Sequence, residues 1–146
     1  MRIAVVFDTP YPKYSPERHR QQLDHEMQGK TGLDPEVEYQ VGAALLENNH
    51  EILLIGLGED LGVILQHCNE WKPDLVMNCA EAFGDARHDY VVPAVLETAG
   101  YRYTGAPPLG LLVSRDKAMS KKILAYHDIK VPGFATWAPG EGVKEE

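Results

Sequence analysis

The sequence has 146 residues, of which 44% are apolar and 25% are charged, and its net charge is −8. This length suits one domain or slightly more, and a chain of this size can bury a core without a disulfide or a structural metal. The acidic balance argues against a general affinity for nucleic acid or for an anionic membrane surface.

The chain opens with a continuous apolar run, residues 3–7, that ends at Asp8. Such a run is typical of a strand that is buried on both faces of a parallel sheet. It lacks the features of a signal peptide, and no later apolar run approaches the roughly 18 residues that cross a bilayer. The two cysteines, Cys68 and Cys79, form no C-x-x-C pair, so we expect buried thiols in a cytoplasmic protein.

Residues 9–34 form a long polar insertion with scattered prolines and glycines. Part of it, roughly residues 15–28, is compatible with a helix, and a loop of this length is usually functional or mobile. His19 and His25 could be read as metal ligands, but their spacing fits no standard metal site. We therefore favour a solvated arm over a metal site.

Strand and helix patterns then alternate to the end of the chain. Pro35 suits a first helical turn with Asp34 as its cap, and the pattern ends at residues 48–49. The next predicted elements are a strand at 52–57, a helix from 61, a strand at 74–79, a helix over 92–99, a short strand at 101–104, a helix over 116–127 and an extended segment at 131–137.

This alternation predicts an α/β fold of three layers, Rossmann-like, in which helices flank a mainly parallel sheet. Ligands in such folds bind at the carboxyl ends of the strands. Those ends hold Asp8 and the segments 57–58, 78–81 and 104–105. No G-x-G-x-x-G follows the first strand and no P-loop is present, while the glycines of residues 54–62 are only a weak near miss.

The segment NCAEAFGDARHDY, residues 78–90, follows a buried strand and crowds together Glu81, Asp85, Arg87, His88 and Asp89. It fits a solvated loop with a helix cap at Asp89 and a substrate-contacting loop equally well. In the helix over 116–127, we expect Met119, Ile123 and Tyr126 to form the buried stripe. Lysines in the first two turns oppose the helix dipole, which an anion would relieve, although surface lysines explain them too.

Three stretches together resemble the D-alanine–D-alanine ligase family and its ATP-grasp relatives. They are DLVMNCAEAFG, VPAVLETAGYRYTGAPPLGLLVSRDKAMSKKIL and IKVPGFATW. The order of a leucine-rich helix, a Tyr-Thr-Gly turn, an Asp-Lys helix start and a Val-Pro strand is that of the family's N-terminal, pre-ATP-grasp domain. The resemblance covers about half of the chain in detail, from residue 74 to residue 136.

The resemblance implies an ATP-dependent carboxylate–amine ligase of the peptidoglycan type, which activates a carboxylate as an acyl phosphate. It places Lys117 at a nucleotide phosphate. It also implies that Glu81, with Glu17 or Asp34, binds the substrate ammonium. The family commonly has His-Gly where this sequence has Glu81-Ala82, and its first loop is Gly-Gly-x-Ser-x-Glu-Arg where this sequence has the insertion, so the resemblance leaves D-alanine and another small substrate equally open.

The resemblance divides the chain into a pre-ATP-grasp domain, residues 1–112, and a linker helix and first strand, residues 113–146. The metal-binding carboxylates and most of the adenine pocket of the family lie beyond residue 137. We therefore expect ATP and magnesium to bind mostly outside this chain, with a missing ATP-grasp domain or a second chain as partner, and we expect the isolated chain to be inactive. The alternatives are a non-catalytic binding or dimerisation module, for which a homodimer is expected, and an unrelated flavodoxin-like or receiver-like domain.

Overall fold

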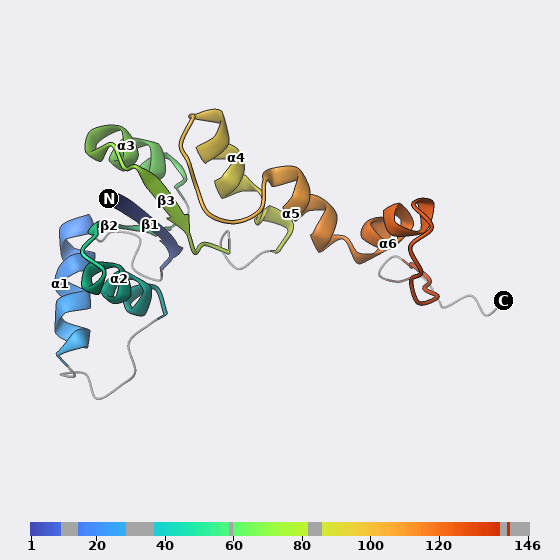
Figure 1. Cartoon of the computed structure of the whole chain (residues 1–146), viewed down its shortest axis with the longest axis horizontal. Coiled ribbons are helices and arrows are strands. Elements are labelled where there is room, and N and C mark those ends of the chain that lie inside the picture. Colours follow the sequence, from blue (N-terminus) through green and yellow to red (C-terminus); the bar gives the residue numbers. More distant parts are fainter. Residues whose placement is uncertain (10–14, 29–36, 59, 82–85, 138–139, 141–146) are drawn as a thin grey trace.

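The computed structural model describes residues 1–9, 15–28, 37–58, 60–81, 86–137 and 140. The elements of these segments form an α/β domain that continues into a helical arm (Figure 1). They are β1 (Arg2–Asp8), α1 (Pro16–Met27), α2 (Val37–Glu47), β2 (Glu51–Leu57), α3 (Gly62–Trp71), β3 (Leu75–Asn78), the short 3-10 helix η1 (Ala86–His88), α4 (Val91–Thr98), α5 (Pro108–Arg115) and α6 (Lys117–Tyr126).

The three strands form one parallel sheet in the order β2-β1-β3. The central strand β1 is buried along its middle, as its continuous apolar run predicts. The predicted strand at 101–104 is reduced to a single parallel bridge between Val76 and Tyr103. The predicted α/β fold with a parallel sheet flanked by helices is thus confirmed.

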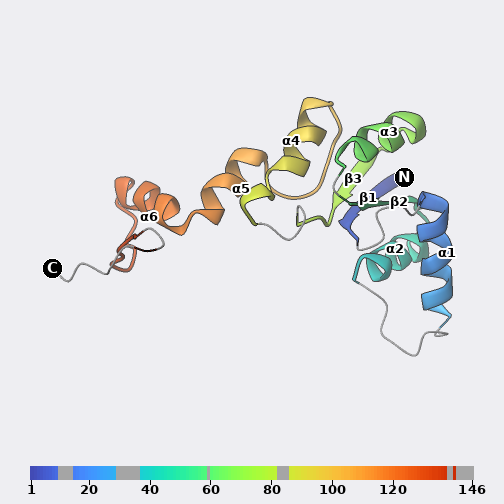
Figure 2. The ribbon, with the colours of Figure 1, turned by 180° about the vertical axis from the view of Figure 1, so that it is seen from behind.

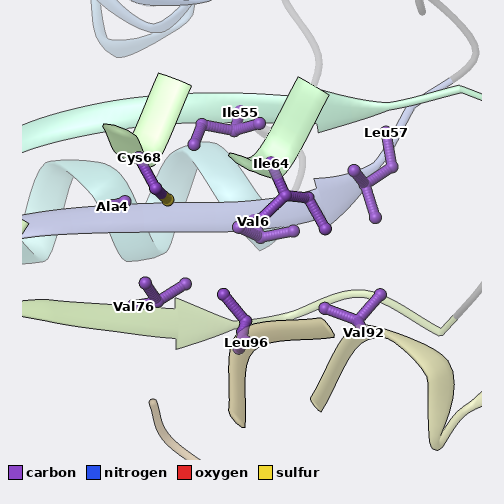
Figure 3. Close-up of a cluster of buried hydrophobic side chains, with 9 residues drawn as sticks. All are labelled: Ala4, Val6, Ile55, Leu57, Ile64, Cys68, Val76, Val92 and Leu96. Carbon is purple, nitrogen blue, oxygen red and sulfur yellow. The ribbon is translucent and has the colours of Figure 1, made fainter. Parts of the chain in front are cut away.

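Side chains alternate between the two faces of the sheet, because successive residues of a strand point to opposite sides. Val5, Phe7 and Leu54 pack with Leu23 of α1 and with Tyr39 and Ala43 of α2. The opposite face packs against α3 and α4, and Figure 3 shows its core of Ala4, Val6, Ile55, Leu57, Ile64, Cys68, Val76, Val92 and Leu96. Burial raises the pKa of the Cys68 thiol to about 11, so Cys68 is buried as predicted. Cys79, for which burial was also predicted, is only partly buried.

The insertion contributes a core element to this fold, which corrects one expectation. Residues 16–27 form helix α1, as the sequence predicts, but this helix is not a solvated arm. His19 is fully buried against the sheet, its ring packs edge-on against Phe7 with 5.1 Å between the centroids, and its Nδ1 is hydrogen-bonded to the Tyr39 hydroxyl at 3.0 Å. The described residues contain no group of three potential metal-ligating side chains. The predicted helix start at Pro35, with its cap Asp34, lies outside the described residues.

The helices α5 and α6 form an arm that projects away from the sheet (Figures 1 and 2). Helix α5 was not predicted from the sequence. It begins at a double proline, which has the fixed φ that a first helical turn requires. The arm begins beside α4, with which α5 is in contact.

The predicted buried stripe of α6 is wrong for this chain. Met119, Ile123 and Tyr126 are 45%, 41% and 84% exposed. Periodicity identifies the apolar face of a helix, but the face is buried only where a second element covers it. Helix α6 packs against α5 and leaves this face open. No helix in the described ranges is long and apolar enough to cross a membrane.

Candidate nucleotide and substrate site

The carboxyl edge of the sheet brings together polar groups from β1, β3 and the segment after α4. The N–H of Glu81 donates a hydrogen bond to Oδ2 of Asp8 at 2.7 Å. The N–H of Asn78 donates to Oγ1 of Thr104 at 3.1 Å, and the N–H of Ala80 donates to Oδ1 of Asn78 at 3.2 Å. These bonds fix the backbone after β3 and leave Glu81 exposed beside Asp8. Two neighbouring acidic side chains at this edge suit a cationic ligand group such as an ammonium.

Glu17 lies at a different strand of the sheet. It belongs to the first turn of α1 and lines a cavity of about 380 Å³ with Arg20 and with residues 52–54 of β2. Hydrogen bonding from the Ser15 side chain and the Glu17 backbone lowers the pKa of its carboxyl group. Glu17 lies beside β2 and Glu81 follows β3, and β1 separates these two strands. The two glutamates therefore lie toward opposite edges of the sheet. Their joint role in substrate binding stays a prediction, as does that of Asp34, which lies outside the described residues.

Lys117 is the first residue of α6 and lines a cavity of about 520 Å³ at the junction between α5 and α6. Asp116 caps α6, because its Oδ1 accepts the N–H groups of Ala118 at 2.9 Å and Met119 at 2.8 Å. The cavity is lined by Arg87, Tyr90, Leu111, Leu112, Arg115, Asp116 and Lys117. Among the described residues, this lining therefore contains three cationic side chains and one carboxylate.

Asp89 has a different role from the predicted helix cap. The residue before α4 is Tyr90, and it makes no side-chain cap. Asp89 instead forms an ion pair with Arg115, and its side chain is only 6% exposed. Sequence reasoning singled out neither Arg115 nor the contribution of Arg87 to the cavity. The Ser-Arg-Asp-Lys string at residues 114–117 was the available sequence signal. In it, Arg115 forms the ion pair, Asp116 caps the helix and Lys117 lines the cavity.

The cavity suits an anionic ligand with several oxygen atoms. Arginine and lysine are the side chains that bind phosphate most often, arginine through a planar fork and lysine as a point charge. Residues 107–137 contain five arginines and lysines and only two aspartates, although the whole chain is acidic. Within the described ranges, no acidic cluster accompanies these cations that would hold a metal ion. The described residues of the cavity thus fit a phosphate group.

No family model matches the sequence. The chain is 31% identical over 101 residues to a D-alanine–D-alanine ligase of Moorella thermoacetica, a match that covers 69% of this chain and 31% of the relative. It is 29% identical over 121 residues to a D-alanine–D-alanine ligase of Syntrophotalea carbinolica, covering 80% of this chain and 38% of the relative. The chain thus spans about a third of the length of these curated relatives.

Comparison of the fold with solved structures also finds D-alanine–D-alanine ligases. Two crystal structures of D-alanine–D-alanine ligase from Bacillus anthracis, one of them complexed with ATP, superpose with a TM-score of 0.59. The superposition covers 99% of this chain and 40% or 41% of the ligase, at 24% and 25% sequence identity. By sequence and by fold, the chain is a homologue of the D-alanine–D-alanine ligases and corresponds to the N-terminal domain of that family.

Proposed function

We propose that the chain is the substrate-side domain of a D-alanine–D-alanine ligase-like enzyme that joins a carboxylate to an amine with ATP. The observation that supports this most is the superposition of nearly the whole chain on a part of an ATP-complexed ligase. The whole enzyme would be about three times as long as this chain, in line with the share of the relatives that it covers. We propose a cytoplasmic location for it, since its substrates would be ATP and small amino acids.

In this proposal, the chain supplies binding groups rather than the complete reaction centre. Lys117 faces a nucleotide phosphate and neutralises charge that develops during phosphoryl transfer. Glu81, with Glu17 or Asp34, orients the ammonium group of an amino acid or a dipeptide-like substrate. ATP supplies the phosphoryl group when it is bound, and magnesium would be held by residues outside this chain.

We propose a division of the chain into residues 1–112 and residues 113–146, the second part leading into an ATP-grasp domain. The boundary falls within α5, so the arm begins before it. The apolar side chains that the arm exposes support a missing partner domain. They are Leu109, Leu112, Met119, Ile123, Leu124, Tyr126, Ile129, Phe134 and Trp137. Exposed apolar surface of this extent marks a contact with another domain or chain.

The test is a chimera in which residues 1–137 replace the corresponding part of the Bacillus anthracis ligase. We expect ATP-dependent phosphate release with D-alanine or another amino acid from a panel. Lys117→Met should lower kcat/KM by about a hundredfold, because the transition state loses one charged contact. Lys122→Met is the matched control, since Lys122 is an exposed lysine of the same helix that does not line the cavity.

Two results would contradict the proposal, one from the chimeras and one from a separate assay of the isolated chain. Equal activity of the chimeras with lysine or methionine at position 117 would remove Lys117 from the nucleotide site. ATP turnover by the isolated chain would contradict the expectation that this domain is inactive alone.

The second candidate function is a non-catalytic binding or dimerisation module, which the apolar arm also supports. Here two copies would cover each other's α6 and residues 129–137. Sedimentation velocity over a range of concentrations should then show a dimer, and Ile123→Lys should shift it to monomer. Met27→Lys is the matched control, because Met27 is similarly exposed but belongs to α1 in the body of the domain. A chain that stays monomeric at the highest concentration would exclude this candidate.

A further inference from the structure

Asp89 is an almost fully buried carboxylate that lies between η1 and α4. It forms an ion pair with Arg115, the last residue of α5, whose own side chain is 51% exposed. A buried charge depends on its partner far more than a surface charge does, because water cannot replace the lost contact. The pair therefore links the body of the domain to the arm through a contact that is costly to break.

The three consecutive residues 115–117 perform three separate tasks at the start of α6. Arg115 connects the chain to the body through Asp89, and Asp116 caps the new helix. The Ser120 hydroxyl also donates a hydrogen bond to the Asp116 carbonyl at 2.6 Å. Lys117 follows directly and lines the cavity together with Arg115. The position of Lys117 relative to the body is thus set within two residues of the ion pair.

The rest of α5 offers little to hold this junction in place. None of its eight residues is buried, although α5 contacts α4 and η1. Leu109 and Leu112 are 70% and 49% exposed. A helix that is attached to its domain mainly by partly exposed contacts can change its angle at low cost. The ion pair between the buried Asp89 carboxylate and the last residue of α5 holds that angle at the end nearest to Lys117.

We infer that Asp89 and Arg115 are a positioning pair, which holds the α5–α6 junction against the domain and so sets the direction of Lys117 in the cavity. The part that concerns phosphate rests on the proposed function of Lys117. The part that concerns the junction stands on the ion pair and on the exposure of α5. The variant that separates this role from simple electrostatics is Asp89→Asn, which removes a negative charge close to the cavity.

The experiment uses the ¹⁵N-labelled chain and two readouts, with inorganic triphosphate as the probe. The first readout is the heteronuclear NOE of the amides of residues 115–120, which reports on fast motion of the junction. The second is the triphosphate Kd from amide shifts of Lys117. Asp89→Asn should lower the NOE values and weaken triphosphate binding by roughly fivefold. Charge alone would tighten binding in this variant, because it makes the chain less acidic.

Further variants identify the pair as the cause. Arg115→Met should have a larger effect than Asp89→Asn, and the double variant should be less perturbed than Arg115→Met alone, because it leaves no unpaired buried carboxylate. Arg115→Lys keeps the charge and should restore part of both readouts. Arg20→Met is the matched control, since it removes an arginine from an exposed pair with Asp24, at 3.3 Å, and should leave the junction unchanged.

The two readouts can contradict two different claims, the role of Lys117 in phosphate binding and the positioning role of the ion pair. If the wild-type chain shows no triphosphate binding that depends on Lys117, the proposed role of Lys117 is wrong, and the NOE values alone decide the inference. If Asp89→Asn leaves the NOE values unchanged and triphosphate binds equally or more tightly, the positioning role is wrong whether or not Lys117 binds phosphate.

Discussion

Replacing Gly56 by alanine is expected to destabilise the folded chain by about 3 kcal/mol. Gly56 lies on β2 opposite Phe7, on the face of the sheet that α1 and α2 cover. A Cβ atom at this position would lie 2.4 Å from Nε2 of His19 and 2.6 Å from Cγ2 of Thr9. Both distances are far below van der Waals contact, so the neighbouring atoms would have to move.

The His19 ring has little room to move away from an added methyl group. It is fully buried, is hydrogen-bonded to the Tyr39 hydroxyl and packs against the ring of Phe7. Its displacement would shift α1 from the sheet or break the contact with Tyr39. The absence of a side chain at Gly56 therefore makes the space in which the imidazole lies.

Urea denaturation measures this effect directly, as the difference in unfolding free energy between the two chains. Gly133→Ala is the matched control, because an added Cβ there meets nothing within 4 Å. We expect the control to stay within about 0.5 kcal/mol of the wild type. A Gly56→Ala chain as stable as the control would mean that the imidazole does not occupy the space above Gly56.

The strands of this fold were predictable because their apolar runs are continuous and bounded. The runs at residues 3–7, 52–57 and 74–79 correspond to β1, β2 and β3. The pattern carries no information about neighbours, so the order β2-β1-β3 came only from the structure. The fourth run failed because residues 101–104 contribute one bridge to β3 rather than a ladder.

The arm shows where periodicity stops being informative. The start of α6 was predicted correctly, because an aspartate cap followed by helical periodicity is a local signal. The burial of Met119, Ile123 and Tyr126 is a property of a second element that must cover them, and α6 leaves them exposed. Helix α5 was missed because it is only eight residues long and contains Gly110, which weakens its helical pattern.

The candidate site was predictable only residue by residue. Lys117 stood out because a lysine at a helix start conflicts with the dipole, and the structure places it in a cavity with two arginines. The ion pair of the neighbouring Arg115 with Asp89 could not be foreseen, because it joins two segments that are distant in the sequence. His19 was misread for the same reason, since a polar insertion gives no sign that one of its side chains fills a space above a glycine of β2.

Acid is expected to destabilise the chain through His19, over the range from pH 6.5 to about 4. Burial lowers the pKa of His19 from 6.5 to about 4 in the folded chain. At pH 7 the imidazole is mostly neutral in both states, so its contribution to the pH dependence is small there. As the pH falls below 6.5, the unfolded chain binds a proton that the folded chain does not bind, and the equilibrium shifts toward unfolding.

The expected loss is about 1.4 kcal/mol for each pH unit within this range, and about 3 kcal/mol in total. Glu17 acts in the same direction, because hydrogen bonding lowers its pKa from 4.5, but its contribution is lost only below that pH. Unfolding free energies between pH 7 and pH 5 therefore report mainly on His19. Urea denaturation at a series of pH values in constant ionic strength measures them.

A comparison of two histidine variants in one helix isolates the effect. His19→Asn keeps a hydrogen-bonding atom near the position of Nδ1 but cannot bind a proton, so it should be less stable at pH 7 and should lose most of the slope. His25→Asn changes an exposed histidine of the same helix and should keep the wild-type slope. A slope that survives in His19→Asn, or a wild-type chain equally stable at pH 7 and pH 5, would show that the imidazole of His19 stays accessible to protons in the folded chain.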